Sequence, residues 1–217
     1  MAIKNACFIS YSHGQGQSDL IKRFIEQLKK AFENELYTYL GERERVQPVF
    51  LDTDRLKPGF DYTVSLSKAI CESVCMIVVY TPSYDESDYC IREFCAMEKI
   101  ERERIEKLGN MYDNQYRMII PIILRGVNLP DNIKKIHYQN DFSKYALWST
   151  EISQSPDFEP IIREIVNVIY EIYGMLKQDP DLFEHHNCSN FTIPSFDEVK
   201  NSWIKYKKQP IFPGRTS

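Results

Sequence analysis

The sequence predicts a three-layer α/β fold, in which helices cover both faces of a four- to five-stranded, mostly parallel sheet. Two observations carry this prediction. Short apolar runs alternate with amphipathic helical patterns through residues 1–176, which is the pattern of βαβ units. The run Val74–Thr81 is continuously apolar and rich in β-branched residues, as expected for a strand covered on both faces. Right-handed crossovers then place helices on both sides of the sheet.

Each predicted element follows from its local pattern. Strands are expected at Ala6–Tyr11, Val46–Asp52, Val74–Thr81 and Tyr116–Leu124, and "QNDFSKYALW" is a candidate for a short last strand. Pro48 indicates that the second strand starts there or lies at a sheet edge. Helices are expected at Ser18–Leu40, Tyr62–Ser73, the charged stretch that follows Ser87, and Glu159–Leu176. Ser18 is the expected N-cap of the first helix.

The last part of the chain breaks this alternation. Residues 177–217 contain several prolines, the cluster "HHNCSNF" and one helix-like piece, "SFDEVKNSWIKYKK". We therefore expect one domain over residues 1–176 and an appendage over residues 177–217. The appendage is expected to pack on the domain or on a partner protein.

Composition excludes several classes of function. The net charge is -4 and the sequence pI is about 5.7, with basic residues scattered among acids, so no nucleic-acid partner is expected. No Cys-x-x-Cys pair occurs, and "HHNC" lacks a second ligand pair, so no metal site is expected. No signal peptide or apolar run of about 20 residues is visible, which argues against a membrane span.

The six cysteines favour a reduced, cytoplasmic protein. Five of them lie in or beside apolar segments, where a free cysteine behaves as a small hydrophobic residue. These five are Cys7, Cys71, Cys75, Cys90 and Cys95.

The predicted topology alone indicates a cleft at the carboxyl ends of the strands. In open parallel sheets, ligands bind outside the carboxyl ends of the strands where the strand order switches direction, and in a flavodoxin-like order this point lies between the first and third strands. The segments that leave those strands are "SYSHGQGQSD" and "TPSYDESDYCIRE". We therefore expect Tyr11, Ser12, His13 and the Gly14/Gly16 loop to face Ser83, Tyr84 and Glu93 across this cleft. A Ser12–His13 hydrolase pair is not expected, because neighbouring side chains in a strand point to opposite faces.

Three blocks around this cleft resemble the TIR (Toll/interleukin-1 receptor) domain family. They are "ACFISYSH", "FLDTDRLKPGFDYTVSLSKAICES" and "IVVYTPSYDESDYCIREF", in the family's order and spacing. The resemblance covers roughly Ile3 to Leu176 and places Pro58-Gly59 at the tip of the BB loop. The third block matches Ser-x-Trp-Cys-x-x-Glu, with Tyr89 in place of Trp and Glu93 as the final residue.

The resemblance implies an enzyme that cleaves NAD between nicotinamide and ribose, since catalytic TIR domains carry a glutamate at the Glu93 position and adaptors usually lack it. NAD would be the substrate, with no separate cofactor. The family pattern implies Glu93 as the catalytic residue. It implies NAD contacts at Tyr11, Ser12, His13, Arg55, Phe60, Ser83 and Tyr89.

The resemblance further implies self-association through TIR–TIR contacts, a role in bacterial anti-phage immunity, and release of ADP-ribose or of a cyclic or linked form. Two other functions stay open. The chain is alternatively a non-catalytic adaptor that assembles through "DRLKPGFD", or a binder of an NAD-derived signal.

One carboxylate suffices for NAD cleavage. Ordinary glycosides require two carboxylates, but nicotinamide departs from NAD as a neutral base and requires no general acid. Glu93 is expected in the first turn of its helix, where the macrodipole favours the ionised form, while its apolar neighbours oppose ionisation by desolvation. The other acids of this helix, Glu98, Glu101, Glu103 and Glu106, are expected at the surface.

Overall fold

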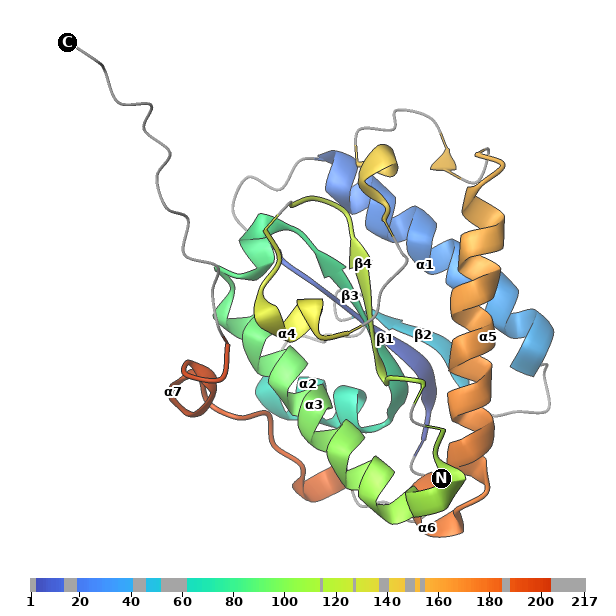
Figure 1. The fold of residues 1–217 in the computed structure, drawn as a ribbon, viewed down its shortest axis with the longest axis vertical. Helices are drawn as coiled ribbons and strands as arrows, with labels where there is room; N and C mark the ends of the chain where they lie inside the picture. The colour runs from blue at the N-terminus through green and yellow to red at the C-terminus, as the bar shows by residue number, and fades with distance from the viewer. Residues whose placement is uncertain are drawn as a thin grey trace.

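A four-stranded parallel sheet forms the centre of the protein (Figure 1). The computed structural model describes residues 3–13, 19–40, 46–51, 62–113, 115–126, 128–136, 141–146, 151–152, 155–184 and 188–203. The strands are β1 (Asn5–Tyr11), β2 (Gln47–Leu51), β3 (Ser73–Tyr80) and β4 (Ile119–Ile123), in the order β2-β1-β3-β4. The predicted α/β fold with flavodoxin-like order is confirmed.

The edges of the sheet resolve two open points of the sequence. β2 is an edge strand, which accommodates Pro48 within it. Beyond β4, Asp141 forms only an isolated parallel bridge with Ile123, where a fifth strand was a candidate. In the middle of the sheet, all eight residues of β3 are buried. The switch in strand order falls between β1 and β3, with Tyr11 aligned to Val79.

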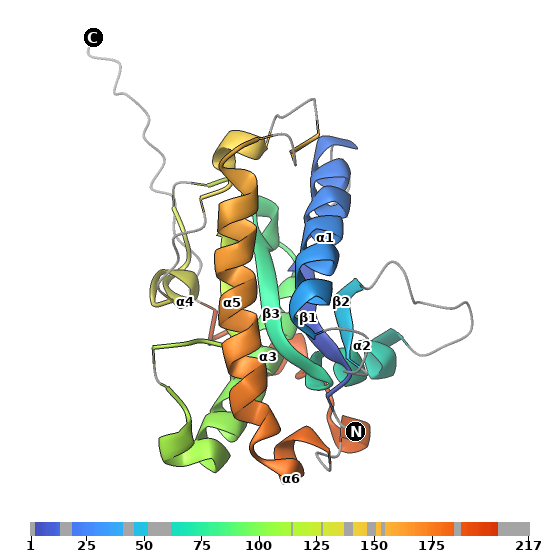
Figure 2. The ribbon, with the colours of Figure 1, turned by 90° about the vertical axis from the view of Figure 1, so that its right-hand side faces the viewer.

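Helices cover both faces of the sheet. The longer ones are α1 (Asp19–Leu40), α2 (Tyr62–Cys71), α3 (Asp88–Leu108) and α5 (Phe158–Lys177). Figure 2 shows α1 and α5 side by side on one face, and α2 and α3 lie on the other. Short helices occur at α4 (Asp131–Lys134), α6 (Pro180–Phe183) and α7 (Phe196–Val199), with 3-10 turns η2 (Pro82–Tyr84), η3 (Gly109–Met111), η4 (Ser143–Tyr145) and η6 (Cys188–Asn190). No helix in these described ranges has the length and apolar character that crossing a membrane requires.

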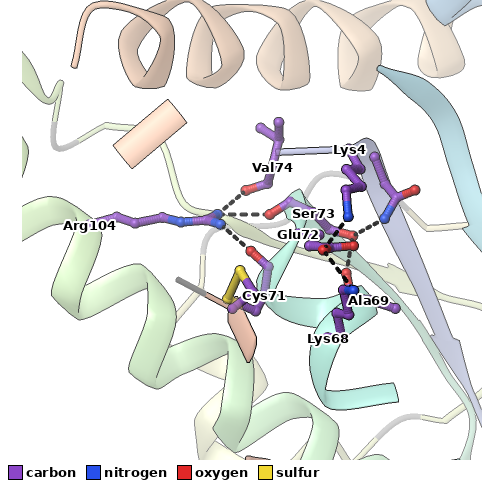
Figure 3. The surroundings of a disulfide bond; sticks show 10 residues. Lys4, Lys68, Ala69, Cys71, Glu72, Ser73, Val74 and Arg104 are labelled. Carbon is purple, nitrogen blue, oxygen red and sulfur yellow. Dashed lines mark hydrogen bonds and ion pairs between the residues drawn. A yellow bond between two sulfur atoms is a disulfide. The ribbon is translucent and has the colours of Figure 1, made fainter. Parts of the chain in front are cut away.

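A buried arginine fixes the junction between α2 and β3 (Figure 3). The Arg104 guanidinium donates to the carbonyl oxygens of Cys71 at 2.8 Å, Ser73 at 2.8 Å and Val74 at 3.1 Å. Burial lowers the pKa of Arg104 to about 10. The predicted helix Tyr62–Ser73 therefore ends early, since Ser73 pairs with Asn5 as the first residue of β3.

Glu101 is buried, so its prediction as a surface acid is wrong. Its carboxylate accepts two hydrogen bonds from Arg117, at 2.8 and 2.6 Å, and one from the Met118 backbone N–H at 2.7 Å. These contacts tie α3 to the residues that precede β4. They explain why an acid on a charged helix lies inside the protein, because each oxygen has a donor.

Residues 188–203 lie on the face of the domain that α2 and α3 form. A disulfide joins Cys188 to Cys71 at the end of α2, so the expectation of a wholly reduced protein is wrong for this pair. The free cysteines in the structure are Cys7, Cys75, Cys90 and Cys95. The Ile193 N–H donates to Ser67 Oγ at 2.9 Å, and Arg92 Nε donates to the Pro194 carbonyl at 2.7 Å. α7 packs beside α3 (Figure 1).

Candidate functional site

Glu93 lies in a buried position near the start of α3. The helix begins at Asp88, and the N-cap Ser87 accepts a hydrogen bond from the Cys90 N–H at 3.3 Å. Glu93 is thus the sixth helical residue and belongs to the second turn, so its prediction in the first turn is wrong. The macrodipole acts mainly within the first turn and therefore supports the Glu93 carboxylate less than expected. Its side chain is 5% exposed.

A chain of hydroxyl groups positions the Glu93 carboxylate. Ser10 Oγ, near the end of β1, donates to Glu93 Oε2 at 2.6 Å. The Tyr84 hydroxyl, from η2, lies 2.8 Å from Ser10 Oγ and donates to the Cys90 carbonyl at 3.2 Å. Each hydroxyl carries a single proton, and the proton of Ser10 points to Glu93, so the Tyr84 proton is shared between the Ser10 oxygen and the Cys90 carbonyl. Burial raises the pKa of Tyr84 well above its ordinary value, so this phenol stays protonated.

Sequence reasoning missed Ser10, and it placed Tyr84 at the cleft without predicting its contact with Ser10. The available signal was a serine inside the apolar run "ACFISY". A polar side chain in a buried strand requires a hydrogen-bond partner, and Glu93 is the partner that the fold supplies. This bond joins the carboxyl end of β1 to α3, the helix that follows β3, and it fixes the Glu93 carboxylate between them.

The residues after Ser10 lie around the same strand end. The Tyr11 ring is buried and packs against the ring of His13, with centroids 4.1 Å apart. His13 is exposed and Ser12 is buried. Tyr11 and His13 therefore form one aromatic pair at the end of β1, where the switch point lies.

Ser83 and Tyr89 both follow β3, Ser83 in η2 and Tyr89 in the first turn of α3. The Ser83 hydroxyl lies 2.9 Å from Thr81 Oγ1, in the turn after β3. Tyr89 is 54% exposed, and its ring meets the edge of Tyr62 at 5.7 Å. The Arg92 guanidinium covers the Tyr89 ring at 5.5 Å. Tyr89 thus faces outward beside the start of α2, whereas Glu93 lies inside.

Part of the predicted cleft lies outside the described residues. This applies to Arg55 and Phe60, to the Pro58-Gly59 tip and to the Gly14/Gly16 loop. Among the residues that the structure describes, no group of three or more His, Cys, Asp or Glu side chains could hold a metal ion.

A cavity of about 760 Å³ lies elsewhere on the molecule. Its walls come from the later turns of α3 and from the segment before β4, including Glu101 and Arg117. This is the amino end of β4, whereas the Ser10–Glu93 pair lies near the carboxyl end of β1. Because Glu101 is already bonded to Arg117 and Met118, its carboxylate serves the fold rather than a ligand.

The arrangement around Glu93 suits charge stabilisation. A buried carboxylate with one oxygen fixed by a hydroxyl donor is preorganised, and its attraction for a nearby positive charge exceeds the same attraction in water. The Tyr11–His13 pair adds a ring surface at the same strand end.

Comparison with known proteins identifies the sequence pattern. The family model for the TIR domain matches residues 7–154. The probable 2′ cyclic ADP-D-ribose synthase BdTIR of Brachypodium distachyon is 21% identical over 130 residues, which cover 60% of this chain and 57% of that protein. The match thus spans little more than half of the relative's length.

Among solved structures, the TIR domains of the activated Roq1 resistosome recognising the effector XopQ are 20% identical. They match with a TM-score of 0.39, over 92% of this chain and 98% of that one.

Proposed function

Because the chain belongs to the TIR domain family, we propose that it is an NAD nucleosidase that breaks the bond between nicotinamide and ribose. The observation that carries this proposal is the setting of Glu93. The residue that ends the Ser-x-Tyr-Cys-x-x-Glu block is buried at the switch point of the sheet and bonded to Ser10 Oγ. The similarity to a protein named as a probable cyclic ADP-ribose synthase supports the same chemistry.

In the proposed reaction the bond between ribose C1′ and the pyridinium nitrogen breaks. Its electron pair stays on nitrogen, which leaves as neutral nicotinamide. Glu93 stabilises the positive charge that develops on the ribose, or accepts hydrogen bonds from its hydroxyls. Water, or a hydroxyl of the ADP-ribose itself, then bonds to C1′ and loses its proton to solvent. The first route gives ADP-ribose and the second a cyclic product.

Ser10 keeps the carboxylate in place during this step. Its hydrogen bond at 2.6 Å occupies Glu93 Oε2, which fixes the orientation of the carboxylate plane before substrate enters. We propose further NAD contacts from Tyr11, Ser12, His13, Ser83 and Tyr89, with Arg55 and Phe60 in the loop after β2. Tyr11 would lie at the nicotinamide end.

The biological setting belongs to the same proposal. We propose self-association through TIR–TIR contacts, a protein partner or effector at the C-terminal appendage, a role in anti-phage immunity and a cytoplasmic location. The Cys71–Cys188 disulfide is uncommon in a reducing cytoplasm, so this location requires the bond to withstand reduction by cytoplasmic thiols.

Nicotinamide release from NAD by the purified full chain tests the proposal. Glu93→Gln removes the charge and keeps the side-chain size, and we expect it to lower kcat by at least about 100-fold. Glu106→Gln on the exposed side of α3 is the matched control and should retain the wild-type rate. Unchanged nicotinamide release by Glu93→Gln would refute the site. A wild-type chain that self-associates without cleaving NAD under any condition would favour the adaptor alternative.

A further inference from the structure

We propose that Trp203, in the C-terminal segment 188–203, is a positioning residue for Glu93. The inference rests on the proposed NAD cleavage and names a part of the chain that supports it. Residue 203 lies well beyond the span that the TIR family model matches, which ends at residue 154. The support would therefore be a property of this chain's own appendage.

Trp203 is inserted between two aromatic residues of the candidate site. Its side chain is 3% exposed. The indole meets the Phe94 ring at a centroid distance of 5.0 Å and an angle of 76°, and the Tyr84 ring at 6.2 Å and 39°. Phe94 directly follows Glu93 in α3, and Tyr84 carries the hydroxyl that contacts Ser10.

Asp85 fixes the orientation of the indole. Trp203 Nε1–H donates to Asp85 Oδ1 at 3.2 Å, and the Tyr80 hydroxyl donates to Asp85 Oδ2 at 2.8 Å. Asp85 is the residue after Tyr84, at the end of η2. The hydrogen bond and the ring contact therefore act on the same turn, which restricts how far that turn can shift.

Two short routes lead from Trp203 to the carboxylate. The first passes from Tyr84 to Ser10 at 2.8 Å and from Ser10 to Glu93 at 2.6 Å. The second passes through Phe94 and the backbone of α3. Truncation of Trp203 leaves a void into which Tyr84 and Phe94 can relax, because closely packed interiors transmit such shifts. A displacement of about 1 Å at a catalytic group costs on the order of 100-fold in rate.

The segment that carries Trp203 is attached at several points. Cys188 is bonded to Cys71, Ile193 N–H to Ser67 Oγ, and the Pro194 carbonyl to Arg92. The first two contacts are with α2 and the third is with α3. The segment thus bridges the two helices and holds Trp203 between η2 and α3.

Steady-state kinetics of NAD cleavage by the full chain test the positioning role. We expect Trp203→Ala to lower kcat by at least 10-fold while KM changes by less than about threefold, because the affected group acts in the transition state. Trp203→Phe, which refills part of the void, should recover part of kcat. The matched control is Phe183→Ala in α6, where a buried ring packs on Tyr173 at 5.3 Å. It should lower the melting temperature comparably and keep the wild-type kcat.

Urea unfolding of Ser10→Ala, Trp203→Ala and the double variant separates this inference from the proposed function. Coupled residues give non-additive changes in the free energy of unfolding, obtained here from the midpoints and slopes, and this readout requires no NAD cleavage. If the wild-type chain cleaves NAD and Trp203→Ala retains full kcat, the positioning role is wrong and the proposed function stands. If the wild-type chain is inactive, the proposed function fails. Non-additive changes in the free energy of unfolding would then still support the contact route, and additive changes would overturn it.

Discussion

Reduction of the Cys71–Cys188 disulfide should lower the melting temperature of the protein substantially. The bond joins residues separated by 117 positions in the sequence. In the chain-entropy description, a loop of this length restricts the unfolded chain by about 16 cal/mol/K, or about 4.9 kcal/mol at 25 °C. Removal of a native disulfide typically lowers the free energy of unfolding by about 2–5 kcal/mol. For a chain of this size, we expect a decrease of roughly 10 °C.

Thermal unfolding with and without dithiothreitol measures this shift. The matched variant Cys71→Ser/Cys188→Ser should melt at the lower temperature in both conditions, since it has no bond to reduce. Thiol titration of the unreduced, denatured wild-type chain should find the four free cysteines Cys7, Cys75, Cys90 and Cys95. A titration that finds all six thiols, together with a melting temperature independent of reductant, would refute the bond.

The remaining predictions concern buried and titrating groups. Arg104→Met should destabilise the fold by about 3 kcal/mol in urea unfolding, because three backbone carbonyls lose a donor; a loss below about 1 kcal/mol would contradict this role. Glu101→Gln should cost about 2–3 kcal/mol, since the Arg117 pair and a backbone contact depend on the charge; Glu106→Gln is its exposed control. The Ser143 hydrogen bonds lower the pKa of Asp141. Their stabilisation is complete above the unfolded pKa of about 3.9 and is lost as pH falls through the lowered folded value. Asp141→Asn should therefore reduce the decrease in unfolding free energy at acid pH. An unchanged dependence on acid pH would argue against the Asp141–Ser143 hydrogen bonds.

The sequence could predict the sheet because its signal is local. The apolar run Val74–Thr81 requires cover on both faces, and its strand is the fully buried β3. Pro48 restricts its strand to an edge, where β2 lies. Element ends were less predictable, because Ser73 is compatible with either the end of a helix or the start of a strand. Its pairing with Asn5, far away in the sequence, decides between them.

Contacts between distant segments explain what the sequence could not reveal. Nothing near Cys188 in the sequence identifies Cys71 as its partner, since that pairing depends on where the tail crosses α2. Glu101 belongs to a helix whose local sequence is strongly charged. Its burial is favourable because Arg117, from a later segment, pairs with it. Trp203 likewise has no local pattern that points to Tyr84. In each case the deciding contact lies at least 16 residues away.

The alternation of side chains along β1 could have identified Ser10. Neighbouring residues in a strand point to opposite faces, and this argument excluded a Ser12–His13 pair. Applied one step further, it separates Ser10 from Tyr11. The structure shows that separation: Ser10 bonds to Glu93, while the Tyr11 ring packs on His13 two residues on. A carboxylate on one face and an aromatic pair on the other therefore leave the same strand end. If NAD binds across that end, its ribose can meet the Glu93 carboxylate that Ser10 holds, and its nicotinamide can meet the Tyr11–His13 pair.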